Sequence, residues 1–268
     1  IAMSKSAIVC EQAIFTSARG PTGEGYRIVA ASKGLRADEK QKITRCSPSH
    51  ESLCTPGDAD ASPAGAAFYS LPSGRLCVAW SRHAGAEHTG RGGQRVYTHN
   101  LIVSTDDFET CGFNPFNLVR AISQAAIEIQ KLPQSGLIPA LELPVESASH
   151  NRINAESTAL LPHAVRLSAM QQLLEGKPMV VDLPKDWLTW AEALLLSIPA
   201  PLRLQVSFAA GFRFSSGRGH TLHILRDEKN AVKGRVAAQG ISFVGPKSPP
   251  DCDEVAMAVL RGSALAGR

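Results

Sequence analysis

The stretch Gly90–Val103, GRGGQRVYTHNLIV, decides the fold that we predict for this chain. Its second part places Val, Thr and Ile on one side and Tyr, His and Leu on the other, an alternation typical of a β-strand. The residues Leu101–Val103 are apolar on both sides, so the strand 95–103 is expected inside a sheet that is covered on both faces. The glycines before it permit a tight turn or a close approach of the backbone to another group.

The residues that follow this strand predict the start of a helix. Ser104 and Thr105 have side chains that cap helices well. The acidic residues Asp106, Asp107 and Glu109 come next, in the first turn, where the helix dipole favours negative charge. Three clustered carboxylates could also serve acid–base chemistry, but the order of the residues favours the capping interpretation.

Before the strand, the chain is expected to form two β-hairpins. Alternating apolar residues separated by turn residues indicate their strands, which are expected at Ala7–Ser17, Tyr26–Ala31, Ala66–Leu71 and Arg75–Arg82. A short helix, Arg36–Arg45, and a long loop, Ser47–Ala64, lie between the hairpins. A loop of this length in a compact domain is either mobile or functional.

After the strand, a helix with one apolar stripe is expected to begin at Asn114 and to end at Lys131–Pro133. Pro115 suits its first turn, where a missing N–H costs little. The stripe has helical spacing and can pack on the sheet; it consists of Leu118, Val119, Ile122, Ala126 and Ile129. An extended segment, Leu137–Glu146, follows.

The second half is expected to form another domain, after a small, polar boundary at Ser147–Arg152. Apolar stripes and short apolar runs predict helices from near Pro162 to Gly176, at Asp186–Ile198 and at Asp253–Leu260, and strands at Lys177–Leu183, Leu202–Phe208 and Thr221–Leu225. The predicted fold class is α+β, with antiparallel or mixed sheets built from hairpins with packing helices. The predicted domains are 4–146 and 153–268.

Composition excludes several classes of protein. No apolar run approaches the roughly 18 residues that a membrane span needs, and the first residues lack an export signal, so we expect a cytoplasmic location. The formal charge is only +4, and the basic residues are spread along the chain, which makes nucleic acid an unlikely partner. The six cysteines form no CxxC pair, so we expect reduced thiols, no metal and no cofactor.

Two loops carry candidate binding residues. The segment Gly85–Arg91 has the glycine spacing of a phosphate loop, but it has Arg in place of Lys and precedes a strand instead of a helix. We therefore keep Gly90 and Arg91 only as part of a candidate interaction or ligand loop. Around the sequence SSGRGH, Arg213, Arg218 and His220 lie near two phenylalanines. Arginines interleaved with aromatic residues can hold phosphates and stack bases, although solvated arginines beside core phenylalanines are the simpler interpretation.

One cysteine–histidine arrangement remains open as an enzymatic alternative. A hydrolase would need Cys10 or Cys77 within hydrogen-bond reach of His99, and a thiol with a lowered pKa. The simpler interpretation is that the cysteines and His99 are buried structural residues. Because no catalytic motif is recognisable, we expect a protein without enzymatic activity.

Four segments together resemble a known family. They are QAIFTS at Gln12–Ser17, GYRIVAASKGL at Gly25–Leu35, YTHNLIV at Tyr97–Val103 and IPAPLRLQVSFAAGFRF at Ile198–Phe214. The pattern is similar to the N-terminal domain (type 2) and middle domain of GTPase-associated protein 1. The chain departs from the family pattern at Phe15, where a tyrosine is usual, at Ser32–Lys33, where Ser-Pro is usual, and at Ala209–Phe212.

The resemblance implies a non-enzymatic component of a bacterial GTPase-centred conflict system. Its partners would be a GTPase and an associated effector, and its role that of an adaptor or scaffold acting through protein–protein contacts. The family supplies no catalytic residue that could be carried over to this chain. A nucleotide- or nucleic-acid-binding module that uses Arg213, Arg218 and His220, and a Cys/His hydrolase, are the alternative hypotheses.

Overall fold

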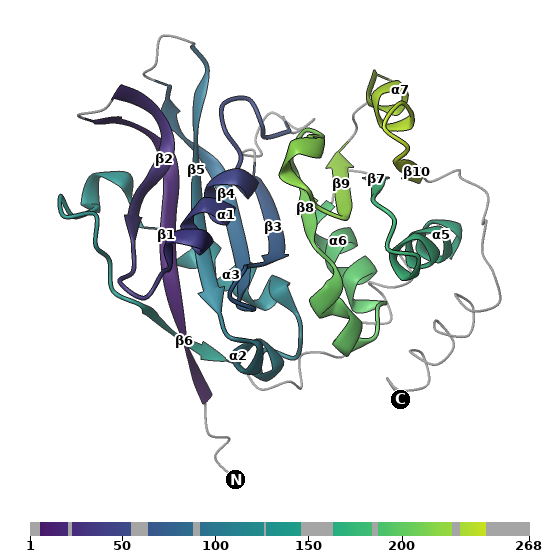
Figure 1. Ribbon diagram of the computed structural model, residues 1–268, viewed down its shortest axis with the longest axis horizontal. Coiled ribbons are helices and arrows are strands. Elements are labelled where there is room, and N and C mark those ends of the chain that lie inside the picture. The colour runs from purple at the N-terminus through teal and green to yellow at the C-terminus, as the bar shows by residue number, and fades with distance from the viewer. Residues whose placement is uncertain are drawn as a thin grey trace. The chain divides into compact units, whose positions relative to one another are not determined.

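The computed structural model describes residues 6–20, 23–54, 64–87, 92–125, 127–145, 163–183, 187–226 and 231–244. Contacts divide the chain into two compact units, Ile1–Ala148 and Ser149–Arg268, and each unit is described by itself (Figure 1). The predicted domain bounds, 4–146 and 153–268, stay a prediction.

The first unit is built on an antiparallel sheet. Its strands are β1 (Ser6–Gly20), β2 (Gly23–Ala31), β3 (Ala64–Ser70), β4 (Leu76–Ala86), β5 (Gln94–Val103) and β6 (Leu141–Val145). Within this unit the strands lie in the order β3-β4-β5-β1-β2, and β6 pairs with the first residues of β1. Both predicted hairpins, β1–β2 and β3–β4, are confirmed.

Strand β5 has the internal position that its sequence predicts. It pairs with β4 on one side and with β1 on the other, and every residue from Val96 to Val103 is buried. Burial on both faces explains why this strand ends in a continuous apolar run instead of an alternating one.

Helices α1 (Ala37–Cys46) and α2 (Thr105–Thr110) cover opposite faces of this sheet. Successive strand residues face opposite sides, so Phe68 and Tyr69 of β3 identify the two faces. Phe108 of helix α2 stacks on Phe68, with ring centroids 5.1 Å apart. Cys46, in helix α1, lies close enough to Tyr69 to interact with it electrostatically. Helix α2 therefore covers one face and α1 the other.

The predicted helix starts are confirmed by their capping bonds. The Ser104 hydroxyl accepts a hydrogen bond from Asp107 N–H at 3.0 Å. The Asn114 side chain accepts one from Phe116 N–H at 3.0 Å and begins α3 (Pro115–Gln124).

The predicted end of this helix is wrong, because α3 stops at Gln124 and Ile129–Lys131 form a separate 3-10 turn, η1. Ile127, Ile129 and Leu132 pack instead on a cluster formed by Ile14, Ala30, Tyr97 and Ile138. Packing of these side chains on a different part of the sheet overrides the continuing helical spacing.

The second unit combines short strands with helices. Its elements are α5 (His163–Leu174), β7 (Met179–Leu183), α6 (Trp187–Leu196), η3 (Ala200–Gln205), β8 (Phe208–Ala210), η4 (Ser216–Arg218), β9 (Leu222–Arg226), α7 (Ala231–Ala237) and β10 (Ser242–Val244). The described pairs β10–β7, β7–β9 and β9–β8 are all parallel. The fold class of the chain is α+β, as predicted, but the hairpins are confined to the first unit among the described pairs.

One strand of the second unit was predicted where the chain is helical. Residues 202–205 belong to the 3-10 helix η3, and β8 begins only at Phe208. Pro199 and Pro201 fix φ near the helical value. The buried Arg203 side chain then donates hydrogen bonds to the carbonyls of Ile198 and Leu196. The predicted helix Asp253–Leu260 lies outside the described residues.

Candidate functional site at the outer edge of strand β2

The outer edge of β2 forms one margin of the sheet in the first unit. Strand β2 lies at the end of the sheet order and pairs with β1 along its inner edge. On the outer edge, Ala31 N–H donates to Gly136 at 2.8 Å and its carbonyl accepts from Ile138 N–H at 3.2 Å. No other main-chain bond is made there within the described residues. An open strand edge presents a row of N–H and C=O groups for pairing.

Side-chain bonds hold the β1–β2 hairpin where it separates from β5. Pairing between β1 and β5 extends only to Thr16 and Tyr97. At this point the Thr16 hydroxyl donates to the Val96 carbonyl at 2.9 Å, and Val96 N–H donates to the Tyr26 hydroxyl at 3.0 Å. The Ser17 hydroxyl donates to the buried Glu87 carboxylate at 2.9 Å. Burial raises the pKa of Tyr26 to about 12, so this residue stays a neutral hydrogen-bonding group.

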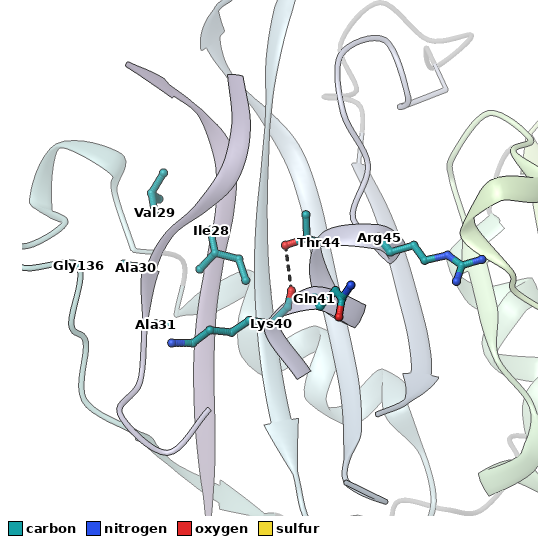
Figure 2. A pocket seen from close by; sticks show the side chains of 9 residues that line it. All are labelled: Ile28, Val29, Ala30, Ala31, Lys40, Gln41, Thr44, Arg45 and Gly136. Carbon is teal, nitrogen blue, oxygen red and sulfur yellow. Dashed lines mark hydrogen bonds between the residues drawn. The ribbon is translucent and has the colours of Figure 1, made fainter. Parts of the chain in front are cut away.

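A groove runs along one side of β2, between the strand and helix α1. This α1 groove has a volume of about 730 Å³ and is lined by Ile28, Val29, Ala30, Ala31, Lys40, Gln41, Thr44, Arg45 and Gly136. Figure 2 shows the Ile28 side chain directed toward the helix and the Lys40 ammonium extending toward the strand, whereas Arg45 points away from Ile28. Lys40 and Arg45 both line the groove, and Lys40 is the one that extends toward β2.

A second groove also borders β2. This arginine groove has a volume of about 660 Å³ and is lined by Thr16, Ser17, Ala18, Arg19, Arg27, Ile28, Val29, Arg95, Ile129, Leu132 and Pro133. The Arg95 guanidinium is fixed by two hydrogen bonds to the Ala84 carbonyl, at 3.0 and 2.8 Å. Arg19 forms an ion pair with Glu24 at 2.7 Å.

The two grooves share a positive character. Neither lining set contains an aspartate or a glutamate. Within the described part of the chain, Arg27, Arg95 and Lys40 form no ion pair, and Arg27 and Arg95 donate only to backbone carbonyls. Cations without local carboxylate partners create a potential that favours anionic ligands.

Residues 9–144 match the family model described as GTPase-associated protein 1, N-terminal domain type 2. The match covers 136 of the 268 residues, a little more than half of the chain. The chain belongs to this family. No curated protein and no solved structure gives a significant match.

Every residue that lines the two grooves lies inside this GTPase-associated domain. The membership fits a component of a GTPase-associated system. The family match ends at residue 144, so the predicted middle domain in the second half stays a prediction.

His99, a predicted site residue within the GTPase-associated domain, is buried in the sheet. Its Nε2 atom forms a hydrogen bond with the Gln12 side chain at 2.8 Å. Burial lowers the pKa of His99 to about 4, so the ring is neutral near pH 7. The grooves do not include this residue.

Cys10 and Cys77 do not have the properties of a nucleophile. The strand register places Cys77 opposite Ile102 and Cys10 next to Glu11, which also pairs with Ile102, so neither thiol lies opposite His99. Burial raises the pKa of Cys10 to about 12 and raises the pKa of Cys77 still further. The Cys77 thiol donates to the Asn100 side chain at 3.7 Å. Cysteine nucleophiles need a lowered thiol pKa, so the geometry gives no support to the hydrolase alternative.

Gly90 and Arg91 lie outside the described residues, but the adjoining loop is visible. Gly92 and Gly93 have positive φ values of 70° and 79°. The His50 Nε2 atom lies 2.6 Å from the Gly92 carbonyl oxygen. A Cβ atom on Gly93 would meet the same ring nitrogen at 3.0 Å. The described glycines thus permit a close approach of the loop to His50.

The three remaining candidates of the second unit differ in exposure. Arg213 is exposed, whereas His220 is 4% exposed. Arg218 lies over the Phe212 ring, 5.4 Å from its centroid, and donates to the Arg213 carbonyl at 3.3 Å. This Arg218 contact uses an aromatic face of the chain's own core, so no observation favours a nucleotide or nucleic-acid site here.

The described residues contain no group of three or more histidines, cysteines and carboxylates that could hold a metal ion. In the same part of the chain, no helix combines the length and the apolarity that crossing a membrane requires.

The grooves were not predicted from the sequence. Ile28, Arg95 and Leu132 come from three distant segments, and no spacing in the sequence links them. The one available signal was the run of Gly and Pro between the predicted strands Ala7–Ser17 and Tyr26–Ala31, which indicated a hairpin but not its place at the edge of the sheet.

Proposed function

We propose that this chain is a non-enzymatic adaptor of a GTPase-associated system and acts through protein–protein contacts with a GTPase and an associated effector. The observation that carries this proposal is the open outer edge of β2, which lies in the family domain and is bordered by two grooves. An adaptor needs such an accessible and rigid surface. In the same proposal, the chain acts in the cytoplasm.

The pKa values of the buried His99 and Cys10 side chains support an adaptor over an enzyme. General acids and bases work best when their pKa lies near the operating pH. Burial instead moves the pKa of His99 to about 4 and that of Cys10 to about 12. These groups are suited to packing and hydrogen bonding.

The proposal is tested by co-purification with a GTPase encoded beside this chain. The full-length protein and that GTPase are co-expressed, with an affinity tag on the chain, and the complex is quantified by size-exclusion chromatography. We expect a stable complex. Ile28→Glu should reduce the recovered GTPase at least tenfold, because Ile28 lines both grooves.

Val9→Glu is the matched control, since Val9 is another β-branched strand residue of the same unit, 60% exposed and outside both grooves. It should leave recovery unchanged, and both variants should keep the thermal midpoint of the wild type within a few degrees. Recovery of no GTPase with the folded wild-type protein would refute the adaptor proposal.

A further inference from the structure

We propose that the partner supplies an extended acidic segment, which pairs with the outer edge of β2 as an additional strand. This inference rests on the proposed function, because it names the chemistry of the partner at the same surface. Three independent features carry it: the free main-chain edge, the groove pair and the charge of the groove residues.

The main-chain edge provides the first argument. In an antiparallel pair, alternate residues direct their N–H and C=O groups away from the partner strand. On β2 these outward groups are bonded only at Ala31, where residues 136–138 pass. Among the described residues, Glu24 to Ile28 make no main-chain bond on this edge, whereas Val29 packs beside Gly136 and Ala30 is buried. Peptides recognised by strand addition gain affinity from such main-chain groups.

The two grooves provide the second argument. The side chains of an added strand alternate between the two faces of the sheet. The α1 groove and the arginine groove both include Ile28 and Val29 of β2. Helix α1 lines the first groove, and Ile129, Leu132 and Pro133 line the second. Each of the two sets of side chains on an added strand therefore has a groove that it can enter.

Charge provides the third argument and identifies the partner's chemistry. Lys40 lines the α1 groove and extends toward β2 (Figure 2). Arg27 and Arg95 line the arginine groove. No carboxylate lines either groove, whereas Arg19 at the end of the hairpin already has Glu24. Complementary charge selects among partners more than it adds affinity. Acidic side chains on both faces of the added strand match this arrangement.

The β1–β2 hairpin is also held in place before any partner binds. The Thr16, Tyr26 and Ser17 side chains tie it to Val96 and Glu87. A surface that is rigid in the free protein loses less conformational entropy on binding. This favours docking of an extended segment on a preformed edge.

The test measures, by fluorescence anisotropy, the binding of the full chain to a fluorescein-labelled decapeptide that repeats Glu-Glu-Val-Val, an order that places glutamates on both faces of a strand. We expect saturable binding, and at least tenfold weaker binding of the matched lysine–valine decapeptide. Equal binding of the two peptides would overturn the acidic assignment, and failure of the glutamate peptide to bind would overturn the inference as a whole.

Two N-methylated forms of the glutamate peptide separate strand addition from simple charge attraction. One form carries methyl groups on the odd-numbered amides and the other on the even-numbered amides. Because an added strand uses only one set of its N–H groups, one form should bind like the parent and the other at least tenfold more weakly. Equal binding of both forms, or loss of both, would overturn strand addition.

Variants of the chain locate the contact. Arg27→Glu and Lys40→Glu should each weaken binding of the glutamate peptide at least fivefold. Lys42→Glu is the control, since Lys42 is on the same helix but does not line the groove. An equal loss in all three variants would show a general charge effect and overturn the assigned location.

The two proposals can fail separately. If the GTPase complex forms and Ile28→Glu disrupts it, but the glutamate peptide does not bind, the adaptor proposal stands and strand addition fails. If the peptide binds and no GTPase complex forms, the edge is a peptide site and the adaptor proposal fails.

Discussion

At the scale of single residues, Glu39 holds helix α1 and with it one wall of the α1 groove. Its side chain is completely buried. It accepts hydrogen bonds from the Arg75 guanidinium, the Ser73 hydroxyl and Arg36 N–H. Burial alone would raise the pKa of this carboxyl, but the three donors outweigh burial and the pKa is lowered. The charged form is therefore the one that the fold stabilises.

Glu39→Gln should lower the free energy of unfolding by about 1.5–3 kcal/mol, the usual worth of hydrogen bonds to a charged group. Urea unfolding followed by circular dichroism measures this change. Asp38→Asn is the control, because the Asp38–Arg36 ion pair is exposed and exposed pairs contribute about 0–1 kcal/mol. Equal effects of the two substitutions would contradict the role assigned to burial.

The Glu39 contribution has a defined pH dependence. Because the folded pKa lies below the ordinary value of 4.5, the stabilisation is fully present above that value and is lost as the pH falls through the folded pKa. The stability difference between wild type and Glu39→Gln should therefore shrink below about pH 4.5.

His99 should make the stability of the first unit depend on pH in a higher range. Its pKa falls from 6.5 to about 4 in the folded protein, so the unfolded chain binds the proton more readily between these values. The stability present above pH 6.5 is then lost as the pH falls, by about 2–3 kcal/mol between pH 7 and 4.5.

The measurement is urea unfolding of wild type and His99→Gln at the two pH values. The variant keeps a polar group near Gln12 but cannot titrate, so its loss on acidification should be smaller by that amount. Equal losses would show that the His99 ring is accessible to protons in the folded state.

The sequence could indicate that His99 lies on a buried strand, but not which group it meets. Its partner, Gln12, is 87 positions away in the chain, and only the register of β1 against β5 brings the two together. The same is true of Glu39. Its partner Arg75 is 36 positions away, between strands β3 and β4.

At the scale of elements, Arg203 links the end of α6 to the 3-10 helix that follows. Its guanidinium donates to the Leu196 and Ile198 carbonyls at 3.0 and 2.8 Å. These are carbonyls of the kind that a helix end leaves without an intrahelical partner. Burial lowers the pKa of Arg203 to about 10, which still leaves it charged at neutral pH.

Arg203→Leu should destabilise the second unit by about 1–3 kcal/mol, because buried carbonyls lose their donors. Thermal unfolding followed by the fluorescence of Trp187 and Trp190, in a Trp80→Phe background, reports this change. Arg213→Leu, at an exposed position, is the control and should change the midpoint little. A similar shift in both variants would contradict the capping role.

Element types were predictable where a single periodicity governs the segment. The hairpins follow from apolar alternation between turn residues, β5 follows from an alternation that ends in an apolar run, and the starts of α2 and α3 follow from Ser104 and Asn114. The end of α3 was not predictable, because Ile129 fits a helical stripe equally well and packs elsewhere only when the sheet is present. Strands β7 and β9 of the second unit were predicted, but their parallel pairing was not, since a short apolar run does not specify its neighbours.

At the scale of the whole molecule, the sheet of the first unit has an internal strand that is paired on both sides and an edge strand that is paired on one side. The internal strand is β5, with β1 and β4 bonded on its two sides. The edge strand is β2, whose outer groups are bonded only at Ala31 within the described chain. The fold class follows from periodicities that a sequence displays, but the site depends on which strand is left at the edge and on which distant residues surround it.

This arrangement predicts an uneven pattern of amide hydrogen exchange in the full-length protein. Amides of Val96–Val103 should exchange slowest, because both neighbouring strands must open first. About half of the amides of Glu24–Ile28 should exchange rapidly, since they face the part of the edge that makes no main-chain bond. When the partner GTPase or the glutamate–valine peptide binds, those rapid amides should become protected at least tenfold, while β5 should stay unchanged. Mass spectrometry of peptic fragments measures both. Protection confined to other segments would place the partner away from β2, and the grooves would then be surface features without a role in binding.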